Sequence, residues 1–540
     1  IYVSNEGNDE TGNGNIDNPY ASLAKAVEAI NGMDDTNFVI EVQSNLTATK
    51  CARIVDKHVT IHGNGHTIIR EEGFNQIQDN ARSTYNPAII EVTVPGGKGA
   101  SLTLENIILD DQGIHEGKYF LQASSDATHQ VEFTSKYSGN KGDYTATYGN
   151  DEIVHDAMIA AYGTSAAEIN ITLGTGAVLK NYGGMSAVRL EANSTLTMEN
   201  DSAIRDDMEK VVKGVWPAAE YAKFPSDTRY TARTDYGAAG AIWLQGGKFI
   251  MNDGAEISDM VGRAVYADSG TATINGTISN ITGDNNMWQG MDGVAVHVRN
   301  NADVTFGSTA LFDNTNVSAK INSAVYVNQG SFNMVNGSKI CNLAGTAIMG
   351  YGSTTQPAGS INITIDGEIC GITNGGNAIN LNESGGLYCK IGPNADIHHN
   401  TVWAATLYAQ GPGIVIDLYG TIRDNTSTQY SAGIWLANNF TGAKLTMHDG
   451  AKITDNTSVD NGAAVIVSRG TFIMDGGTIS DNCSVGNASL AGGVSVRRSG
   501  SFTMNAGQII NNTTTGYGGG VQYNDESWGN ECITLIGGTI

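Results

Sequence analysis

Two aspartates seven positions apart, Asp417 and Asp424, have the residue type and spacing for acid–base chemistry. Asp417 ends one predicted short strand and Asp424 follows the next, so both should project outward on the side bounded by that turn. Glycoside hydrolysis needs two carboxyl groups that flank the scissile bond, about 5–5.5 Å apart for retention and wider for inversion. Two aspartates across one turn would meet the shorter distance, which predicts catalytic roles for both.

The same two positions also have a structural interpretation. Asp424 shares its turn position with Asp455 and Asp481 of later repeats, and Asp475 and Asp481 form a similar pair six residues apart. The setting favours chemistry, because His399 takes the position of Asp424 one repeat earlier. Stacked acids raise one another's pKa and a charged imidazole lowers it, which would separate a protonated acid from an ionised one, as a glycosidase requires.

Aromatic and amide side chains surround this pair of acids. A pyranose ring offers an apolar face for stacking and hydroxyl groups for hydrogen bonds to amides or carboxylates. We therefore predict a carbohydrate-binding face; the alternative is that the rings only stabilise neighbouring strands as cross-strand pairs. The predicted substrate-binding residues are Asn380, His399, Trp403, Tyr408, Gln410, Tyr419 and Trp435.

A repeat provides the elements that would position these side chains. Short V-x-V or I-x-L pairs begin at Val188, Ile242, Val265, Val296, Val325, Ile348, Ile379, Leu407, Ile434, Val465, Val494 and Val521. After a first gap of 54 residues they recur every 23 to 31 residues, and each repeat reads as three short strands. Propeller blades need about 40 residues and four strands. We therefore predict an all-β fold, a right-handed parallel β-helix in which each repeat is one coil.

Two columns of residues follow from this repeat. The middle residue of each first strand should point outward, which gives Arg189, Trp243, Tyr266, His297, Tyr326, Met349, Asn380, Tyr408, Trp435, Ile466, Ser495 and Gln522. One turn position should form a structural ladder of asparagines that bond along the stack, namely Asn400, Asn425, Asn456, Asn482 and Asn512.

The domain organisation follows from where the repeat starts and stops. Residues 1–35 form a predicted N-terminal cap and residues 36–540 the β-helix. Within the cap, residues 22–30 read as a short amphipathic helix that would cover an exposed end of the stack. The chain stops inside a repeat, so we expect further coils, or a cell-wall-anchoring or carbohydrate-binding domain, to follow.

Two insertions interrupt the repeat, at about residues 110–165 and 200–240. The second contains a predicted helix over residues 206–212, followed by Trp216 and several tyrosines. Long insertions in solenoids tend to lie on one face, often the binding face.

Composition excludes several classes of protein. The 540 residues include 30 basic and 55 acidic ones, a net charge of −25, which excludes a protein that coats nucleic acid or an anionic membrane. No apolar run of about 18 residues is present, so we expect no membrane insertion. Hydrophobic residues make up 40% of the chain, enough to fill a core. We expect a monomer.

Cysteine and acid spacing give no strong metal signal. The six cysteines form no CxxC pair, and we interpret them mainly as buried free thiols, although Cys341 and Cys370 hold equivalent repeat positions and would lie close together. The turns at residues 8–9 and 17–18 offer oxygen ligands for a structural calcium, but solvated loops are the simpler interpretation. We predict no required cofactor.

Two resemblances to known families add to this interpretation. The opening IYVS, with GND and NPYASL after it, resembles the start of pectate-lyase-like β-helix proteins, and the GGTISDN repeats resemble cell-surface β-helices of gut bacteria. Within about twelve residues, Asp417 and Asp424 resemble the paired acids of glycoside hydrolase family 136. Members of that family are β-helical lacto-N-biosidases that release lacto-N-biose (Gal-β1,3-GlcNAc) from human milk oligosaccharides.

The narrower resemblance implies a specific activity. The chain would be an extracellular or cell-surface anchored bacterial enzyme that releases lacto-N-biose with retention from the non-reducing end of an oligosaccharide substrate. Asp424 would be the nucleophile and Asp417 the acid/base. A neutral substrate agrees with the low content of basic residues.

Two other functions stay open. One is a polysaccharide lyase, which would need Ca²⁺ or basic residues against a uronate carboxylate, with Arg189, His297 and Arg299 as the candidates. The other is a non-catalytic glycan-binding adhesin, for which the regular repeats are well suited.

Overall fold

The computed structural model of the chain is an all-β solenoid. Three parallel sheets stack in register, consistent with a right-handed parallel β-helix, as predicted. The structure describes the chain except residues 72–84, 87, 113–115, 124–129, 139, 142–144, 149–153, 156, 183–185, 207–229, 233–239, 283–292, 317–320, 353–359, 374, 383–385, 438–441, 461, 463, 487–489 and 525–531. We number the sheets 1, 2 and 3 in the order in which each coil passes through them.

The chain forms two compact units, residues 1–272 with 276–293 and residues 273–275 with 294–540. In the first unit, sheet 1 contains β4 (Ala52–Val55), β8 (Ile90–Thr93), β16 (Ile159–Tyr162), β19 (Val188–Glu191), β23 (Ile242–Gln245) and β26 (Val265–Asp268). Sheet 2 contains β1 (Tyr2–Val3), β2 (Asn37–Val42), β5 (His58–His62), β9 (Ala100–Glu105), β17 (Ile169–Leu173), β20 (Ser194–Met198) and β24 (Lys248–Met251), with β27 (Thr271–Ile274) at the unit boundary. Sheet 3 contains β3 (Leu46–Ala48), β6 (Thr67–Arg70), β10 (Ile108–Asp110), β18 (Val178–Lys180), β21 (Ala203–Arg205), β25 (Glu256–Val261) and β28 (Thr277–Thr282).

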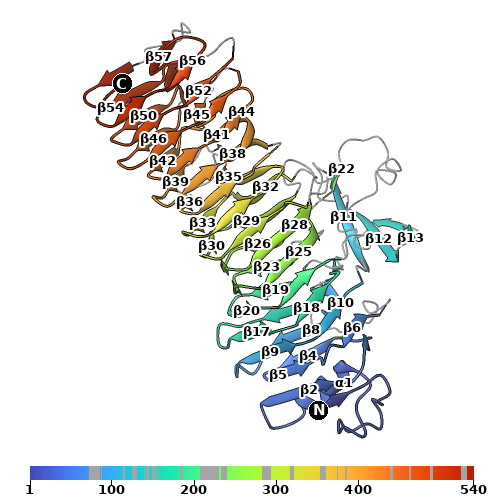
Figure 1. Cartoon of the computed structure of the whole chain (residues 1–540). Helices are drawn as coiled ribbons and strands as arrows, with labels where there is room; N and C mark the ends of the chain where they lie inside the picture. Colours follow the sequence, from blue (N-terminus) through green and yellow to red (C-terminus); the bar gives the residue numbers. More distant parts are fainter. Residues whose placement is uncertain are drawn as a thin grey trace. The chain divides into compact units, whose positions relative to one another are not determined.

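The second unit holds the predicted site residues. Its sheet 1 contains β29 (Val294–Arg299), β32 (Ser323–Val327), β35 (Thr346–Tyr351), β38 (Gly375–Asn382), β41 (Thr401–Gln410), β44 (Thr426–Ser427), β45 (Ile434–Ala437), β48 (Thr457–Ser458), β49 (Val465–Ser468), β52 (Cys483–Ser484), β53 (Val494–Arg497), β56 (Thr513–Thr514) and β57 (Val521–Asn524) (Figure 1). Sheet 2 contains β30 (Ala302–Phe306), β33 (Gly330–Met334), β36 (Ile361–Ile365), β39 (Leu387–Ile391), β42 (Ile414–Leu418), β46 (Lys444–Met447), β50 (Thr471–Met474), β54 (Ser501–Met504) and β58 (Cys532–Leu535). Sheet 3 contains β31 (Leu311–Asp313), β34 (Lys339–Cys341), β37 (Glu368–Cys370), β40 (Asp396–His398), β43 (Thr421–Arg423), β47 (Lys452–Thr454), β51 (Thr478–Ser480) and β55 (Gln508–Ile510).

The core of each coil is filled by the inward residues of these alternating strands. In sheet 3 of the second unit the central position of successive strands is a buried isoleucine, as at Ile397, Ile422 and Ile453. Identical side chains also stack in sheet 2, where the rings of Phe472 and Phe502 lie 5.0 Å apart. Because each strand pairs with the equivalent strand of the next coil, an apolar residue at one position is covered by its counterparts, and the repeat itself generates the core.

The register of sheet 1 confirms the predicted V-x-V repeat. All twelve predicted pairs lie in strands of this sheet. The predicted column is directly paired where its partners are described, for example Asn380 with Tyr408 and Tyr408 with Trp435.

The predicted asparagine ladder is also present. The side chains of Asn400, Asn425, Asn456 and Asn482 are buried, and each Nδ2 donates to Oδ1 of the next asparagine, at 2.9, 3.0, 3.0 and 2.8 Å, ending at Asn512. The residue before each ladder asparagine has a left-handed backbone.

The N-terminal helix forms where the sequence predicted it. Helix α1 spans Leu23–Asn31, and the Ser22 side chain caps it by accepting from the backbone N–H of Lys25. Its apolar face is buried, and Asn31 bonds the backbone of β4 through Arg53 and Val55. Among the described residues, no helix has the length and apolar character needed to cross a bilayer.

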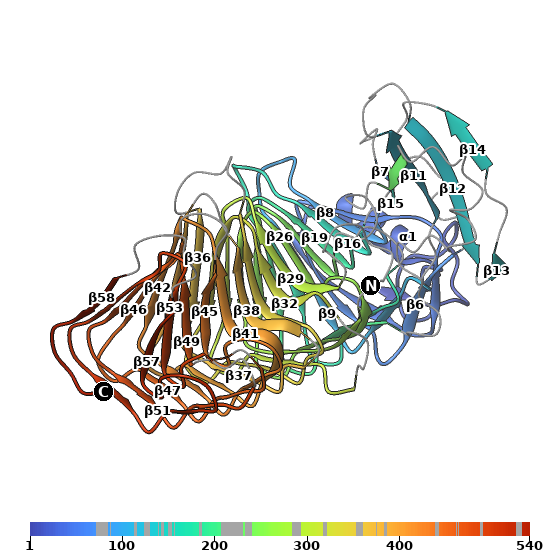
Figure 2. The ribbon, with the colours of Figure 1, turned by 90° about the horizontal axis from the view of Figure 1, so that it is seen from above.

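The insertions form a separate antiparallel sheet in the first unit. Strands β11 (Glu116–Ala123), β12 (Gln130–Ser138), β13 (Asn140–Lys141) and β14 (Thr145–Tyr148) come from the first insertion (Figure 2). Strand β22 (Tyr230–Ala232) comes from the second insertion and pairs with β11, so both insertions contribute to one sheet. In addition, β7 (Tyr85–Asn86) pairs with β15 (Val154–His155). The helix predicted at 206–212 and Trp216 lie outside the described residues beyond Asp206.

Candidate functional site

Asp417 lies on the outer face of sheet 2 in the second unit. Strand β42 alternates, so Ile416 and Leu418 are buried in the core while Asp417 points outward and is partly exposed. The Tyr388 hydroxyl donates to Asp417 Oδ2 at 3.0 Å, and His448 Nε2 lies 2.9 Å from Asp417 Oδ1. Two neighbouring coils therefore hold this carboxylate from both sides.

Two further side chains complete this group. The Tyr419 ring stacks on His448, with centroids 4.1 Å apart and planes 3° from parallel. Lys390 Nζ lies 5.4 Å from the centroid of the Tyr419 ring, which places a cation over its face. We call Tyr388, Lys390, Asp417, Tyr419 and His448 the Asp417 cluster. Partial burial, followed by the hydrogen bond to Asp417, raises the pKa of Tyr388 to about 12.

The Asp417 cluster is suited to fixing a charge and moving a proton. The Asp417 carboxylate orients the His448 ring through Nε2, as a carboxylate does for an imidazole that acts in proton transfer. Tyr388 is 37% exposed, so a ligand on the face of sheet 2 can reach the hydroxyl that contacts Asp417.

Asp424 lies in a different setting. It follows β43 with a φ of 52°, in the same left-handed turn column as His399, Asp455 and Asp481. Short polar residues tolerate this conformation better than others do, which explains the residue type without chemistry. Its Oδ2 pairs with Arg423 Nη1 at 2.6 Å.

Arg423 links Asp424 to a second acid instead of to Asp417. The Arg423 Nε and Nη2 atoms lie 3.0 and 2.7 Å from the two carboxylate oxygens of Asp396. The hydrogen bonds that the Arg423 guanidinium donates to Asp396 and then to Asp424 raise its pKa. Asp417 thus lies within β42 whereas Asp424 follows β43, and their described polar contacts share no residue.

His399 is placed where the repeat predicted it, one coil from Asp424 in the same turn column. Its Nδ1 lies 2.7 Å from Nδ1 of His398, and the two rings meet edge to face. His398 in turn contacts Glu368 and Asp396 on sheet 3. The described contacts therefore group His399 with His398.

The predicted aromatic residues of sheet 1 do come together. Trp403 meets Tyr430 edge to face at 5.7 Å, and Tyr430 stacks on Trp435 at 4.4 Å. Tyr408 meets Trp435 edge to face at 5.2 Å and donates a hydrogen bond to Gln410 Oε1. We call Trp403, Tyr408, Gln410, Tyr430 and Trp435 the Trp403 cluster.

Tyr430 was not among the predicted site residues. It lies in the segment between β44 and β45, outside the strand positions that the repeat pattern marks. The signal available in the sequence was its position five residues before Trp435, in a coil already rich in aromatic residues.

The edge of the Trp403 cluster carries polar atoms that face no described protein partner. Asn380 pairs in register with Tyr408, and its Oδ1 is buried without a hydrogen bond among the described residues. The Trp435 indole Nε1 is likewise buried and unbonded within that part of the chain. A buried amide acceptor and a buried indole donor, each without a partner among the described residues, therefore lie beside aromatic rings.

The outward column of sheet 1 is less open than predicted. His297, Tyr326, Ile466 and Ser495 of this column are buried. At Ile466 the reason is visible, because Leu490 and Ala491 form a small apolar cluster with it outside the coil, against which Tyr430 and Trp435 pack. Trp403, 51% exposed, and Tyr351, 48% exposed, are open parts of this face.

Among the described residues, the outward positions in the middle of this face carry no charge. The outward positions from β35 to β49 are held by Met349, Tyr351, Asn380, Asn382, Tyr408, Gln410, Trp435, Ala437, Ile466 and Ser468. A surface of amides and rings without formal charge is suited to a neutral ligand.

The basic candidates for a lyase are engaged in protein contacts. Arg189 is buried, donates to Gln245 Oε1 at 2.8 Å and pairs with Glu191 at 3.0 Å. His297 is 1% exposed and meets the Tyr326 ring at 5.0 Å. Arg299 lies at the end of β29 and also has interactions within the protein.

The N-terminal turns considered for calcium use their oxygens in the fold. Asp9 accepts from the backbone of Ala21 and Ser22 and from the Ser22 hydroxyl, while Asn8 Oδ1 accepts from two backbone N–H groups. Asn18 Nδ2 donates to the backbone of Thr11. These contacts fix the turn that precedes α1.

The interpretation of the cysteines as free thiols is wrong for one pair. Cys341 and Cys370, directly opposed on β34 and β37, form a disulfide. In-register stacking brings equivalent positions within one strand spacing, so the same repeat position in two consecutive coils suffices. Cys51, Cys389, Cys483 and Cys532 are free.

Comparisons with known proteins leave the family open. No protein-family model matches the chain, and no curated protein matches it. What the structure establishes is a parallel β-helix-like solenoid.

Proposed function

We propose that this protein binds neutral oligosaccharides outside the cell, on the face of sheet 1 around Trp403. The observation that carries the proposal is the Trp403 cluster itself. A half-exposed indole meets the ring of Tyr430, which stacks on Trp435, and the unbonded Trp435 Nε1 and Asn380 Oδ1 lie next to these rings. Few convergent polar groups among apolar rings are the usual composition of a small-ligand site.

Charge narrows the class of sugar. The outward positions of sheet 1 between Met349 and Ser468 are uncharged and provide nothing to neutralise a uronate carboxylate. The net charge of −25 would also repel a polyanion. A neutral oligosaccharide such as a lacto-N-biose unit is therefore preferred over pectin or alginate.

An extracellular or cell-surface location is part of the proposal. The Cys341–Cys370 disulfide supports it, because disulfides form and persist in oxidising compartments. We propose that the chain acts there as a monomer, with the oligosaccharide as its partner.

Hydrolysis is the second candidate function, in the form of a retaining lacto-N-biosidase similar to glycoside hydrolase family 136. The Asp417 cluster favours it, since a carboxylate held by a tyrosine and a histidine on an outer face suits acid–base work. In this form Asp424 would serve as nucleophile, and it would have to leave Arg423 to share one substrate bond with Asp417.

One experiment tests the binding proposal. Isothermal titration with lacto-N-tetraose and with polygalacturonate, each with and without EDTA, compares the wild type with Trp403→Ala and with Tyr517→Ala, a control aromatic that is 79% exposed elsewhere in the second unit. We expect W403A to weaken binding of the neutral sugar about tenfold and Y517A to leave it unchanged. Equal binding by W403A, or preference for the polyuronate, would refute the proposal.

Turnover separates the two candidates. Incubation with p-nitrophenyl lacto-N-bioside should release p-nitrophenol if the protein is a hydrolase, and Asp417→Asn and Asp424→Asn should each abolish that release. Binding without release establishes a glycan-binding protein, and release that survives both substitutions contradicts the assignment of the acids.

A further inference from the structure

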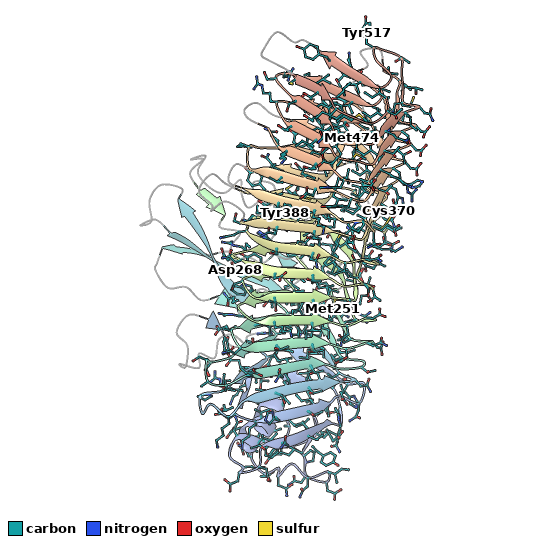
Figure 3. All side chains as sticks on the ribbon, turned by 90° about the vertical axis from the view of Figure 1, so that its left-hand side faces the viewer. Met251, Asp268, Cys370, Tyr388, Met474 and Tyr517 are labelled. Carbon is teal, nitrogen blue, oxygen red and sulfur yellow. A yellow bond between two sulfur atoms is a disulfide. The ribbon has the colours of Figure 1, made fainter. Side chains whose placement is uncertain are left out.

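A column of two cysteines and a histidine lies on the outer face of sheet 3 in the second unit. Cys341, Cys370 and His398 end strands β34, β37 and β40 and are directly paired in register. The residue before each of them is a core isoleucine, so the three side chains point outward together. Figure 3 labels Cys370 in this sheet, away from the strand that carries Tyr388.

Glu368 adds a carboxylate to this column. Its Oε1 lies 3.2 Å from His398 Nε2, and its Oε2 pairs with Lys339 Nζ at 2.7 Å. The ligand atoms of Cys341, Cys370 and Glu368 all lie within 4.8 Å of one another. Two sulfur atoms and a carboxylate oxygen therefore converge on one spot, and His398 Nε2 lies beside that carboxylate.

This donor set is that of a zinc-type site. Zn²⁺ takes four ligands in a tetrahedron and binds cysteine sulfur, histidine nitrogen and carboxylate oxygen. Calcium and magnesium are not suited, because they take oxygen ligands. The disulfide keeps both sulfur atoms bonded to each other in the present state, so they are available to a metal only after reduction.

We propose that reduction of the Cys341–Cys370 disulfide creates a site for a zinc-type divalent cation, with Cys341, Cys370, Glu368 and His398 as ligands. This inference is independent of sugar binding. A small dithiol supplies the electrons: its thiolate attacks the sulfur of Cys370, which is partly exposed, whereas Cys341 is buried. The dithiol leaves as a cyclic disulfide, and its two hydrogens end on the two protein sulfur atoms.

Metal binding then exchanges protons for the cation. The two thiols lose their protons to solvent, and the contact between His398 Nε2 and Glu368 Oε1 gives way to bonds from both atoms to the cation. Two thiolates and one carboxylate bring three negative charges to the dication, and Lys339 beside Glu368 compensates the remaining one. His399 contacts His398 through Nδ1 and so orients Nε2 toward the site.

The test uses Cd²⁺ as the probe, because its thiolate complexes absorb in the ultraviolet. The parent is the full chain with Cys532→Ser, which removes the exposed free thiol. One sample is reduced with dithiothreitol under native conditions and desalted without oxygen, and another is left oxidised. We expect the reduced sample to gain two titratable thiols and to bind one equivalent of Cd²⁺ that the oxidised sample does not bind, with Zn²⁺ displacing it.

Substitutions assign the ligands. Cys341→Ser and Cys370→Ser should each remove the cadmium–thiolate signal of the tight site, while the control Cys483→Ser, a free cysteine of sheet 1, should keep it. His398→Asn and Glu368→Gln should weaken Cd²⁺ binding about tenfold or more. The proposal is overturned if native dithiothreitol treatment exposes no new thiols, if the oxidised protein binds Cd²⁺ equally, or if C341S and C370S retain the site.

Discussion

The hydroxyl of Tyr388 donates a 3.0 Å hydrogen bond to Oδ2 of Asp417 from the preceding coil, and His448 of the following coil approaches Oδ1 of the same carboxylate at 2.9 Å. Three consecutive coils thus meet at one acid. Among the described residues, this is where Asp417 has its polar partners, and the arrangement has a measurable consequence for Tyr388.

Removing the charge of Asp417 should lower the pKa of Tyr388. Burial and the Asp417 contact raise that pKa to about 12. Asp417→Asn removes the second cause but leaves the first, so we expect a pKa between about 10 and 12. A pH titration of ¹³C-labelled tyrosine by NMR, with Tyr388→Phe to assign the signal, measures it; an unchanged pKa would mean that the hydrogen bond is absent in solution.

The direction of this shift also fixes a pH dependence of stability. The folded state holds the Tyr388 proton more tightly than the unfolded state does. The contribution of Tyr388 to folding stability is therefore fully present below about pH 10. That contribution is lost as the pH rises toward about 12. Denaturation experiments across this pH range should show a smaller loss of unfolding free energy for Y388F than for the wild type.

The turn column predicts how Asp424 variants behave. Asp424→Asn should retain stability because asparagine tolerates the left-handed backbone, whereas Asp424→Ala should destabilise the fold by about 1 kcal/mol. Asp455 has the same conformation in the next coil, so D455N and D455A are matched controls for urea denaturation. If D424N abolishes sugar hydrolysis while D455N does not, Asp424 has a chemical role beyond its turn.

The asparagine ladder should be costly to interrupt. Asn456→Ala leaves the buried backbone N–H of Asn425 without its acceptor, removes one of the two acceptors of Asn425 Nδ2, and removes the side-chain donor to Asn482. We expect a loss of about 3 kcal/mol in unfolding free energy, because each unpaired buried group costs about 1–3 kcal/mol. Asn505→Ala, which loses only an exposed bond to Asp475, is the control and should cost less than about 0.5 kcal/mol.

An acid-side prediction concerns Glu41 in the first unit. Burial raises the pKa of Glu41, but hydrogen bonds from His62 and Asn64 outweigh burial and leave it below its usual 4.5. The contribution of Glu41 to folding stability is therefore present above about pH 4.5 and is lost as the pH falls through the lower pKa that Glu41 has in the folded state. His62→Phe should reduce it by less than about 1 kcal/mol, since both groups are partly exposed. Acid unfolding of H62F against a His58→Phe control measures this; an identical acid midpoint in the two variants would contradict it.

The sequence was sufficient for the architecture because a solenoid encodes its fold locally. The V-x-V pairs mark sheet 1, and equal spacing places Asn425 over Asn456 without any long-range information. The helix over Leu23–Asn31 was equally readable, from the Ser22 cap and its apolar face. Register then fixes which residues stack, which is why the outward column was correct in its pairing.

Contacts beyond register could not be predicted from it. Tyr388 pairs with Val415 across the sheet but reaches Asp417 diagonally, because a long side chain spans to the next outward position. The Asp424 carboxylate pairs with Arg423, because a neighbouring guanidinium is a charged hydrogen-bond donor for it. The pairing of both insertions in one sheet, through β11 and β22, depends on long-range strand contacts that no repeat encodes.

The asparagine ladder has one more implication. From Asn400 to Asn512, each side-chain amide N–H donates a hydrogen bond to the side-chain carbonyl of the asparagine in the following coil. The amide dipoles therefore align head to tail. Such a chain polarises cooperatively, and each bond is strengthened by those before and after it. Substituting a central asparagine by alanine should therefore cost more unfolding free energy than substituting the last one. The aligned amides also give the interior of the stack a net dipole along its axis.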